Sequence, residues 1–183
     1  MSGSLAQPVT DEPVGKAPSG RRIINGLIAA GVRFVAAVPD IVTSEGLLWP
    51  ISSERRLRLI RVCKEDEGVS ICAAMSYNNT RSVLLMQQTG LLDSLNAIRA
   101  IGVDYGLPVV MLVGLQGKES HLPPDRSTSF GVRIVRPILD VMGIEHSVVE
   151  TDRDVDAIEH GIEVAYAESR PRVFLIGREP TAK

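Results

Sequence analysis

Cysteine and aromatic residues are scarce in this sequence of 183 residues. The two cysteines, Cys63 and Cys72, lie in apolar segments and have neither metal-ligand nor disulfide-framework spacing, which fits a reducing cytoplasm. Aromatic residues make up only 4% of the chain, so a surface for stacking nucleic-acid bases is not expected. A formal net charge of −2 also argues against a surface that binds nucleic acid or anionic membranes.

Long apolar runs and several common motifs are also missing. No apolar stretch approaches the roughly 20 residues that span a bilayer, and the amino terminus does not resemble a secretory signal. The sequence has no GxGxxG, GxxxxGK[ST] or GxSxG motif, which excludes the usual dinucleotide, P-loop and hydrolase sites. The three histidines lack metal-ligand spacing, and we expect no metal site. We expect His160 at the surface and His146 in a structural role, whereas His121, in a long polar loop, is the one candidate for a site.

Strand-like and helix-like segments alternate along most of the chain. The segment PVVMLVG at 108–114 is the kind of aliphatic run that parallel strands show when both faces are covered. We expect strands at 33–38, 57–63, 82–87, 108–114, 145–150 and 171–177, with helices at 21–30, 43–51, 67–79, 90–106, 134–143 and 152–169. This alternation predicts an α/β fold, a three-layer α/β/α domain with a mostly parallel sheet.

The first twenty residues differ from the rest. Residues 1–20 are rich in Pro, Gly and Ser and poor in large apolar residues, so we expect a disordered amino-terminal tail. The remaining residues, 21–183, are expected to form one domain, because 44% hydrophobic residues suffice for one substantial core.

Polar residues follow four of the expected strands. In open α/β sheets ligands lie beyond the carboxyl ends of the strands, and the residues there converge on one edge. Loops are polar in any case, so position alone explains these residues equally well without a site. The segments concerned are Pro39–Asp40, KEDE at 64–67 with its three acids, MQQTG at 86–90 and the loop 115–130.

Two of these segments carry a resemblance to a known family. KEDEGVSICAAMSY at 64–77 and MQQTGLLDSLNAI at 86–98 together resemble the pyrimidine-binding domain of thiamin-diphosphate-dependent 2-oxoacid decarboxylases. The separate alpha subunits of sulfopyruvate decarboxylase are most similar, with phosphonopyruvate decarboxylase close behind. Val38-Pro39-Asp40 matches the turn after the first strand in that group, and the resemblance covers roughly residues 21–177.

The resemblance implies a role for one of the three crowded acids. It aligns Glu67 with the glutamate that hydrogen-bonds ring nitrogen N1′ of the aminopyrimidine and favours its imino tautomer. Burial against the apolar residues of the following helix is expected to keep this carboxyl neutral. For Glu65 and Asp66 we favour an ordinary role in the first helical turn, as a cap or as a partner of the helix dipole worth about 0.3–1 kcal/mol.

Further site residues follow from the same resemblance. It implies that Asp40 faces the 4′-amino group and the substrate as a proton relay, although a turn acid after proline explains it equally well. His121 is a further catalytic candidate. The pyrimidine pocket is expected to be lined by Pro39, Glu67, Gln87, Gln88, Thr89 and Gly90, the glycine allowing close backbone approach or serving as an ordinary turn residue.

The resemblance covers only half of such an enzyme. The segment GDG, which with a downstream Asn holds Mg²⁺ and the diphosphate, is absent. A separate beta subunit is therefore expected to carry that domain and most of the Mg²⁺ contacts, in a hetero-oligomer of at least α2β2. The chain alone is not expected to hold thiamin diphosphate tightly.

One position departs from the pattern that the resemblance implies. After the fourth strand Gln116 stands where sulfonate- and phosphonate-using relatives tend to have Arg, and Lys118, His121 or Arg126 are possible replacements. The resemblance implies a small 2-oxoacid as substrate, contacted by Gln116 and Lys118, and this departure leaves the identity of the 2-oxoacid open. The loop 115–130 is either a lid or a contact surface for the beta subunit. Carboligation or aldehyde transfer, and a non-catalytic regulatory subunit, remain alternatives to decarboxylation.

Overall fold

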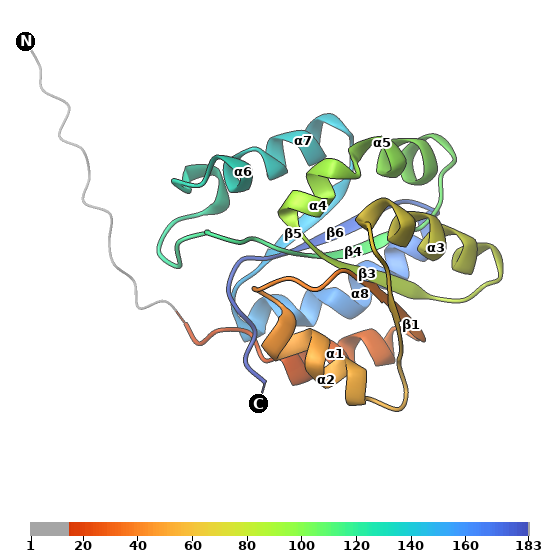
Figure 1. Cartoon of the computed structure of the whole chain (residues 1–183), viewed down its shortest axis with the longest axis horizontal. Helices are drawn as coiled ribbons and strands as arrows, with labels where there is room; N and C mark the ends of the chain where they lie inside the picture. Colours follow the sequence, from red (N-terminus) through yellow and green to blue (C-terminus); the bar gives the residue numbers. More distant parts are fainter. Residues whose placement is uncertain (1–14, 183) are drawn as a thin grey trace, which may run out of the picture.

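Six parallel strands form the centre of residues 15–182, the part of the chain that the structure, a computed structural model, describes (Figure 1). Their order across the sheet is β2-β1-β3-β4-β6-β5, and every neighbouring pair is parallel. The predicted α/β class with a parallel sheet is confirmed. The strands are β1 (Phe34–Ala37), β2 (Arg58–Arg61), β3 (Ser82–Gln87), β4 (Val110–Gly114), β5 (Glu145–Val149) and β6 (Arg172–Ile176).

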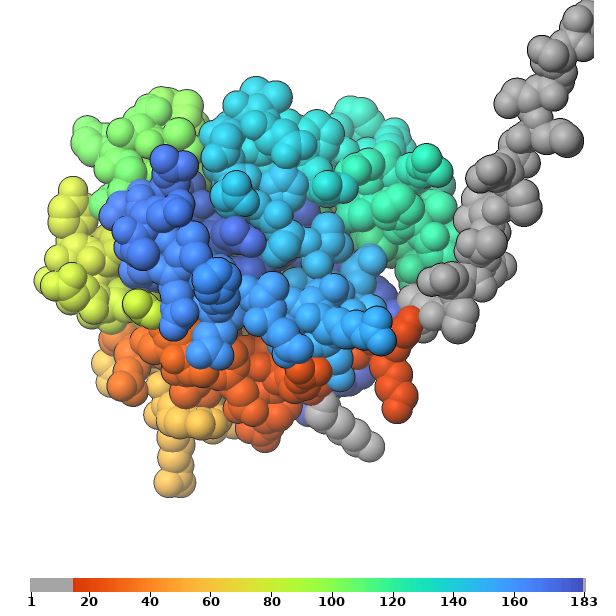
Figure 2. Space-filling model, turned by 180° about the vertical axis from the view of Figure 1, so that it is seen from behind, coloured from red at the N-terminus to blue at the C-terminus, as the bar shows by residue number. Residues whose placement is uncertain are grey.

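Helices cover both faces of this sheet and make it the middle of three layers (Figure 1). One face packs against α1 (Gly20–Ala29), the π-helical turn η1 (Ser44–Leu48), α2 (Trp49–Ser53) and α8 (Asp152–Glu168). Figure 2, seen from behind, shows α8 in blue beside α1 in red. The other face packs against α3 (Glu65–Tyr77), α4 (Gln88–Asp93), α5 (Leu95–Ala97), the π-helical segment η2 (Ile98–Asp104), α6 (Phe130–Arg133) and α7 (Val135–Val141).

The two apolar cores follow from the alternation of side chains along each strand. In β3, Val83 and Leu85 point into the core beneath α1 and α8, whereas Leu84 and Met86 point into the core beneath α3 and α4. Strands covered on both faces need apolar residues at consecutive positions, which is the pattern of the sequence. Both cysteines are free, Cys63 exposed and Cys72 buried.

The expected elements match the observed ones closely, with two differences. The helix expected at 90–106 is divided at Ser94, whose backbone N–H is shared between the carbonyl oxygens of Gly90 and Leu91. The short helix α6 was not expected, because its four residues are too few to show a period. A 3-10 turn, η3 (Pro124–Arg126), lies within the long loop before α6.

The packed part of the chain begins earlier than residue 21. The backbone N–H of Ser19 donates to Asp152 Oδ1 at 2.8 Å, and that of Gly20 donates to the carbonyl of Thr181 at 2.8 Å. Gly20 is the first residue of α1, so these contacts hold the last residues of the predicted tail against the domain. The rest of that tail, residues 1–14, lies outside the described residues.

The strand order places two switch points at the carboxyl edge of the sheet. From β1 the chain passes to β2 on one side and then to β3 on the other, and a second reversal lies between β4 and β6. Loops diverge at such points and leave room for a ligand. Across the described residues, no helix combines the length and apolar character required to cross a bilayer.

Candidate functional site

The structure brings the predicted site residues to one edge of the sheet through three contacts between neighbouring segments. The side chain of Gln88 joins β3 to the loop after β4, where it binds the backbone of Gln116. The turn after β1 lies against β4, because a Cβ atom on Gly114 would be 2.8 Å from Asp40 Oδ1. The first turn of α3 reaches α4 through Glu65 and Gly90. The convergence expected from parallel strands is therefore present.

Glu67 lies in the first turn of α3 and faces outward. Its Oε2 atom accepts the backbone N–H groups of Cys63 at 3.0 Å and Lys64 at 3.3 Å, which is one half of a capping box. Its Oε1 atom accepts no hydrogen bond from any residue in the range 15–182. The expected burial is wrong for this chain alone: Val69 and Cys72 are buried beneath the helix, but the Glu67 side chain is exposed on its outer side.

The acid that reaches toward α4 is Glu65. A Cβ atom built on Gly90 would overlap with Cγ, Cδ and Oε1 of Glu65, so this side chain occupies the space that the glycine leaves open. The structure thus gives Gly90 a packing reason that does not involve a ligand. The plain first-turn role expected of Glu65 omitted this contact, which only the fold creates.

Asp40 is buried, with 7% of its surface exposed, and both of its carboxylate oxygens are used within its own turn. Oδ1 accepts the backbone N–H groups of Val42 at 2.7 Å and Thr43 at 3.0 Å, and Oδ2 accepts the hydroxyl of Thr43. These bonds support the turn-acid interpretation that the sequence left open. Pro39, the preceding residue, is exposed at the same edge.

The three polar residues after β3 have different surroundings. Gln88 is buried, and its amide both accepts from the N–H of Gln116 at 2.8 Å and donates to the carbonyl of Gln116 at 3.0 Å. Gln87 is half-buried and accepts the hydroxyl of Thr89 at 3.0 Å, while Thr89 itself is exposed. Gln88 therefore connects the end of β3 to the loop after β4, and Gln87 and Thr89 are the members of the group that can face a ligand.

Gln116 and Lys118 line a cleft of about 570 Å³ at the second switch point, between the loops that follow β1, β4 and β6. The Lys118 side chain is fully buried, forms an ion pair with Glu150 and donates to the carbonyl of Glu119 at 2.9 Å. A substrate contact through Lys118 would have to break this buried pair. Arg178, which follows β6, lines the same cleft and forms no ion pair within residues 15–182. Sequence reasoning missed Arg178, although its place just after a strand was the available signal.

The loop that carries His121 is braced by an acid that the sequence did not single out. Glu119 accepts the hydroxyls of Ser127, at 2.8 Å, and Thr128, and also the Thr128 backbone N–H at 3.0 Å. These hydrogen bonds, led by the Thr128 hydroxyl, lower the pKa of Glu119 from 4.5 to about 2. His121 and Arg126 are exposed on this loop.

The other two histidines, His146 and His160, lie outside the candidate site. His146 shares a hydrogen bond of 3.0 Å between Nδ1 and the carbonyl of Ile144, and His160 is exposed on α8, as expected of both. Within the described part of the chain, no group of three or more His, Cys, Asp or Glu side chains is arranged to hold a metal ion.

Comparison with known proteins identifies similar chains of one kind. The sulfopyruvate decarboxylase subunit alpha of Methanococcus maripaludis is 27% identical over 95 residues, 52% of this chain and 56% of that protein. The subunit alpha of Methanothermobacter thermautotrophicus is 26% identical over 125 residues, 66% of this chain and 75% of that protein. The sulfopyruvate decarboxylase of Methanosarcina acetivorans is 26% identical over 161 residues, 85% of this chain and 39% of that protein.

The matches therefore span about half of the first of these relatives and less than half of the third. No family model matches the sequence. The similarity to sulfopyruvate decarboxylase, and to its alpha subunit in particular, confirms the resemblance seen in the motifs.

Proposed function

We propose, from this similarity to sulfopyruvate decarboxylase subunits, that the chain is the pyrimidine-binding half of a two-subunit, thiamin-diphosphate-dependent 2-oxoacid decarboxylase. The relatives are named as alpha subunits, and an alpha subunit implies a partner. The proposed partner is a beta subunit that holds the diphosphate and Mg²⁺, in an assembly of at least α2β2.

The observation that carries this proposal is the state of Glu67. Its inner oxygen, Oε2, accepts two backbone N–H groups, so the side chain has a defined direction. Its outer oxygen, Oε1, accepts no hydrogen bond within residues 15–182. A carboxyl that is held on one side and open on the other can bind a ring nitrogen supplied from outside the chain. Because Glu67 is exposed here, the burial that such chemistry needs would come from the partner's surface.

The residues at this edge fit an aminopyrimidine in part. Glu67 offers the outer oxygen to N1′, and Gln87 and Thr89 offer polar groups beside it, whereas Gln88 is already committed to Gln116 and the space at Gly90 holds Glu65. Thiamin diphosphate, when bound, supplies a carbon nucleophile and an electron sink for loss of carbon dioxide. The part of this chain is to orient the ring and to hold a proton at the outer oxygen of Glu67.

The proposed substrate is a small 2-oxoacid with an anionic end. Lys118 is engaged in a buried ion pair, and Gln116 is held through its backbone by Gln88. Arg178 lines the same cleft, donates one N–H to the carbonyl of Gly15 and has no acidic partner within the described residues, so we assign the anionic end to Arg178 in place of Lys118. A guanidinium can bind a carboxylate or sulfonate through two parallel hydrogen bonds.

The test is co-expression with a partner subunit that carries GDG, followed by measurement of carbon dioxide release from sulfopyruvate, phosphonopyruvate and pyruvate. Glu67→Gln should lower turnover by about 100-fold or more, since it removes the acidic proton, and should leave the assembly intact by size-exclusion chromatography. Glu163→Gln, an exposed acid on α8 at the opposite face of the sheet, is the matched control and should retain parental turnover.

Turnover of Glu67→Gln within a few-fold of the parent would contradict the assignment of Glu67. Formation of a carbon–carbon bonded product without free aldehyde would favour the carboligase alternative. A stable assembly that releases no carbon dioxide from any 2-oxoacid would favour the regulatory subunit.

A further inference from the structure

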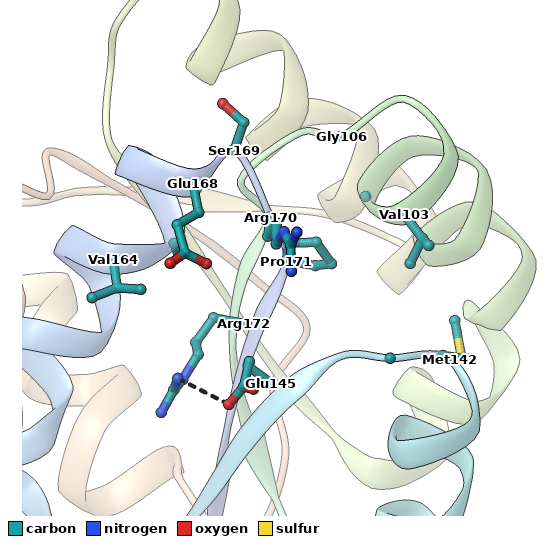
Figure 3. A pocket seen from close by; sticks show the side chains of 13 residues that line it. Val103, Gly106, Met142, Glu145, Val164, Glu168, Ser169, Arg170, Pro171 and Arg172 are labelled. Carbon is teal, nitrogen blue, oxygen red and sulfur yellow. Dashed lines mark ion pairs between the residues drawn. The ribbon is translucent and has the colours of Figure 1, made fainter.

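A second cavity lies at the opposite, amino-terminal edge of the sheet, away from the residues discussed so far (Figure 3). Its volume is about 550 Å³, within the range of about 300–1,000 Å³ that is usual for small-molecule sites. It is enclosed by the end of α8, the end of η2, the turn after α7 and the first residues of β5 and β6. The proposed decarboxylase activity gives this cavity no role.

The upper walls of the cavity are apolar. Val103 from η2 and Met142 from the end of α7 flank one side, while Val164 of α8 lies on the other and Pro171 at the back (Figure 3). Val103 is 39% exposed, so its side chain is open to contact from within the cavity. These residues form a surface that suits a branched aliphatic group of a few carbon atoms.

The polar feature of the cavity is the guanidinium of Arg172, the first residue of β6. The side chain is only 18% exposed, and it forms no hydrogen bond with any residue in the range 15–182. Its Nε atom is buried without a hydrogen-bond partner close to Gly161 of α8, and Nη1 forms an ion pair with Glu145 Oε2 at 3.6 Å, a distance too long for a hydrogen bond (Figure 3). A buried guanidinium with unused donors requires an acceptor from solvent or from a ligand.

Two further charges stand at the rim of the cavity. Arg170 and Glu168 are exposed, and neither forms an ion pair with another described residue. The carbonyl ends of α8 and η2 also point to this edge, so the local potential without arginines would be unfavourable to an anion. Arg170 and Arg172 place two positive charges at this edge, opposite the acids Glu145 and Glu168, and both guanidinium groups have N–H donors that a carboxylate can accept.

We infer that this cavity binds a small free carboxylic acid with a branched apolar body. The carboxylate accepts hydrogen bonds from the Nη groups of Arg172 and from Arg170. The apolar body lies against Val103 and Met142. Because the site is on the far edge of the sheet from Glu67, a bound acid would not occupy the proposed substrate site.

Isothermal titration calorimetry on the full chain tests the inference with 4-methylpentanoate. Isopentylamine has a similar branched body with a cation in place of the carboxylate, and acetate has the carboxylate without the body. We expect saturable binding of 4-methylpentanoate, at least tenfold weaker binding of acetate, and no binding of isopentylamine. Binding of the amine as tight as that of the acid, or no saturable binding of 4-methylpentanoate, would overturn the inference.

Variants assign the binding to this cavity. Arg172→Gln and Arg170→Ala should each weaken 4-methylpentanoate binding by about tenfold or more, as expected for loss of a charged hydrogen bond. Arg170 is exposed, so its removal tests the site even if Arg172→Gln impairs folding. Arg153→Ala, an exposed arginine in the first turn of α8, is the control and should bind as the parent does. Unchanged affinity in Arg170→Ala, with folding confirmed by circular dichroism, would overturn the assignment.

Discussion

At the scale of single residues, Glu65 and Glu67 show how two acids two positions apart come to have different environments. Successive residues of an α-helix are about 100° apart around its axis, so positions i and i+2 point to nearly opposite sides. Glu65 therefore lies over Gly90 of α4, whereas Glu67 turns back to the N–H groups of Cys63 and Lys64. The space for Glu65 comes from the missing side chain of Gly90, and the orientation of Glu67 comes from the capping box of α3.

The contact between Glu65 and Gly90 leads to a stability prediction. Gly90→Ala should destabilise the chain by about 1–3 kcal/mol, because the added methyl group overlaps with the Glu65 side chain. In a Glu65→Ala background the same substitution should cost much less. Chemical denaturation of the four proteins of this double-mutant cycle measures the coupling.

Gly26→Ala is the control for that cycle. A Cβ atom at Gly26, within α1, meets no other atom within 4 Å, so the change should stabilise the helix by about 0.5–1 kcal/mol. Additive effects of Gly90→Ala and Glu65→Ala would show that the two side chains do not compete for the same space.

Lys118 provides a second prediction at the same scale. Lys118→Met should destabilise the chain toward the lower end of about 3–5 kcal/mol, since it leaves Glu150 without its buried partner while that side chain keeps 30% exposure. Lys64→Met removes exposed ion pairs with Asp66 and Asp93 and should destabilise the chain far less. Thermal and urea unfolding compare the two, and equal effects would contradict the buried pairing of Lys118.

At the scale of elements, the loop after β4 is held in shape by its own side chains. Glu119 binds Ser127 and Thr128 across the loop, and Arg133 of α6 donates to the carbonyl groups of the same two residues at 2.8 and 2.9 Å. Arg136 of α7 pairs with Asp125 at 2.7 Å. These bonds connect the loop to α6 and α7, so its expected movement as a lid would have to break them.

The pH dependence of this loop follows from the lowered pKa of Glu119. The pKa of the Glu119 carboxyl is about 2 in the folded chain, against 4.5 ordinarily. Its hydrogen bonds to Ser127 and Thr128 therefore stabilise the loop fully at every pH above 4.5. That contribution is lost as the pH falls from 4.5 through about 2. The NMR shift of the Thr128 amide proton should therefore titrate with a midpoint near 2.

The control is Glu119→Gln, in which the Thr128 amide shift should not titrate in this range. A midpoint near 4.5 in the parent protein would mean that the bonds from Ser127 and Thr128 to Glu119 do not persist in solution.

At the scale of the whole molecule, the proposed division of the site between two subunits leads to a prediction. We therefore expect the isolated chain to release no carbon dioxide from 2-oxoacids and to bind thiamin diphosphate weakly. Addition of the beta subunit should produce a larger assembly, tight cofactor binding and turnover together. Calorimetry and size-exclusion chromatography measure the first two, and turnover by the isolated chain would contradict the divided site.

The order, type and approximate extent of the strands could be predicted from the sequence, because the burial of each strand is recorded in its own residues. β3 at Ser82–Gln87 consists of the apolar run 83–86 with one polar residue at each end. The edge on which the polar residues gather was predictable too, since parallel strands place all their carboxyl ends together. The motifs at 64–77 and 86–98 added the family resemblance.

What each side chain at that edge is free to do depended on contacts between segments far apart in the chain. Gln88 is used by Gln116, and Lys118 is neutralised by Glu150, and neither pairing leaves a periodic trace in the sequence. The exposure of Glu67 likewise depends on how α3 docks on the sheet. Local patterns record which residues are buried, but only the packed chain decides which polar atoms already have partners.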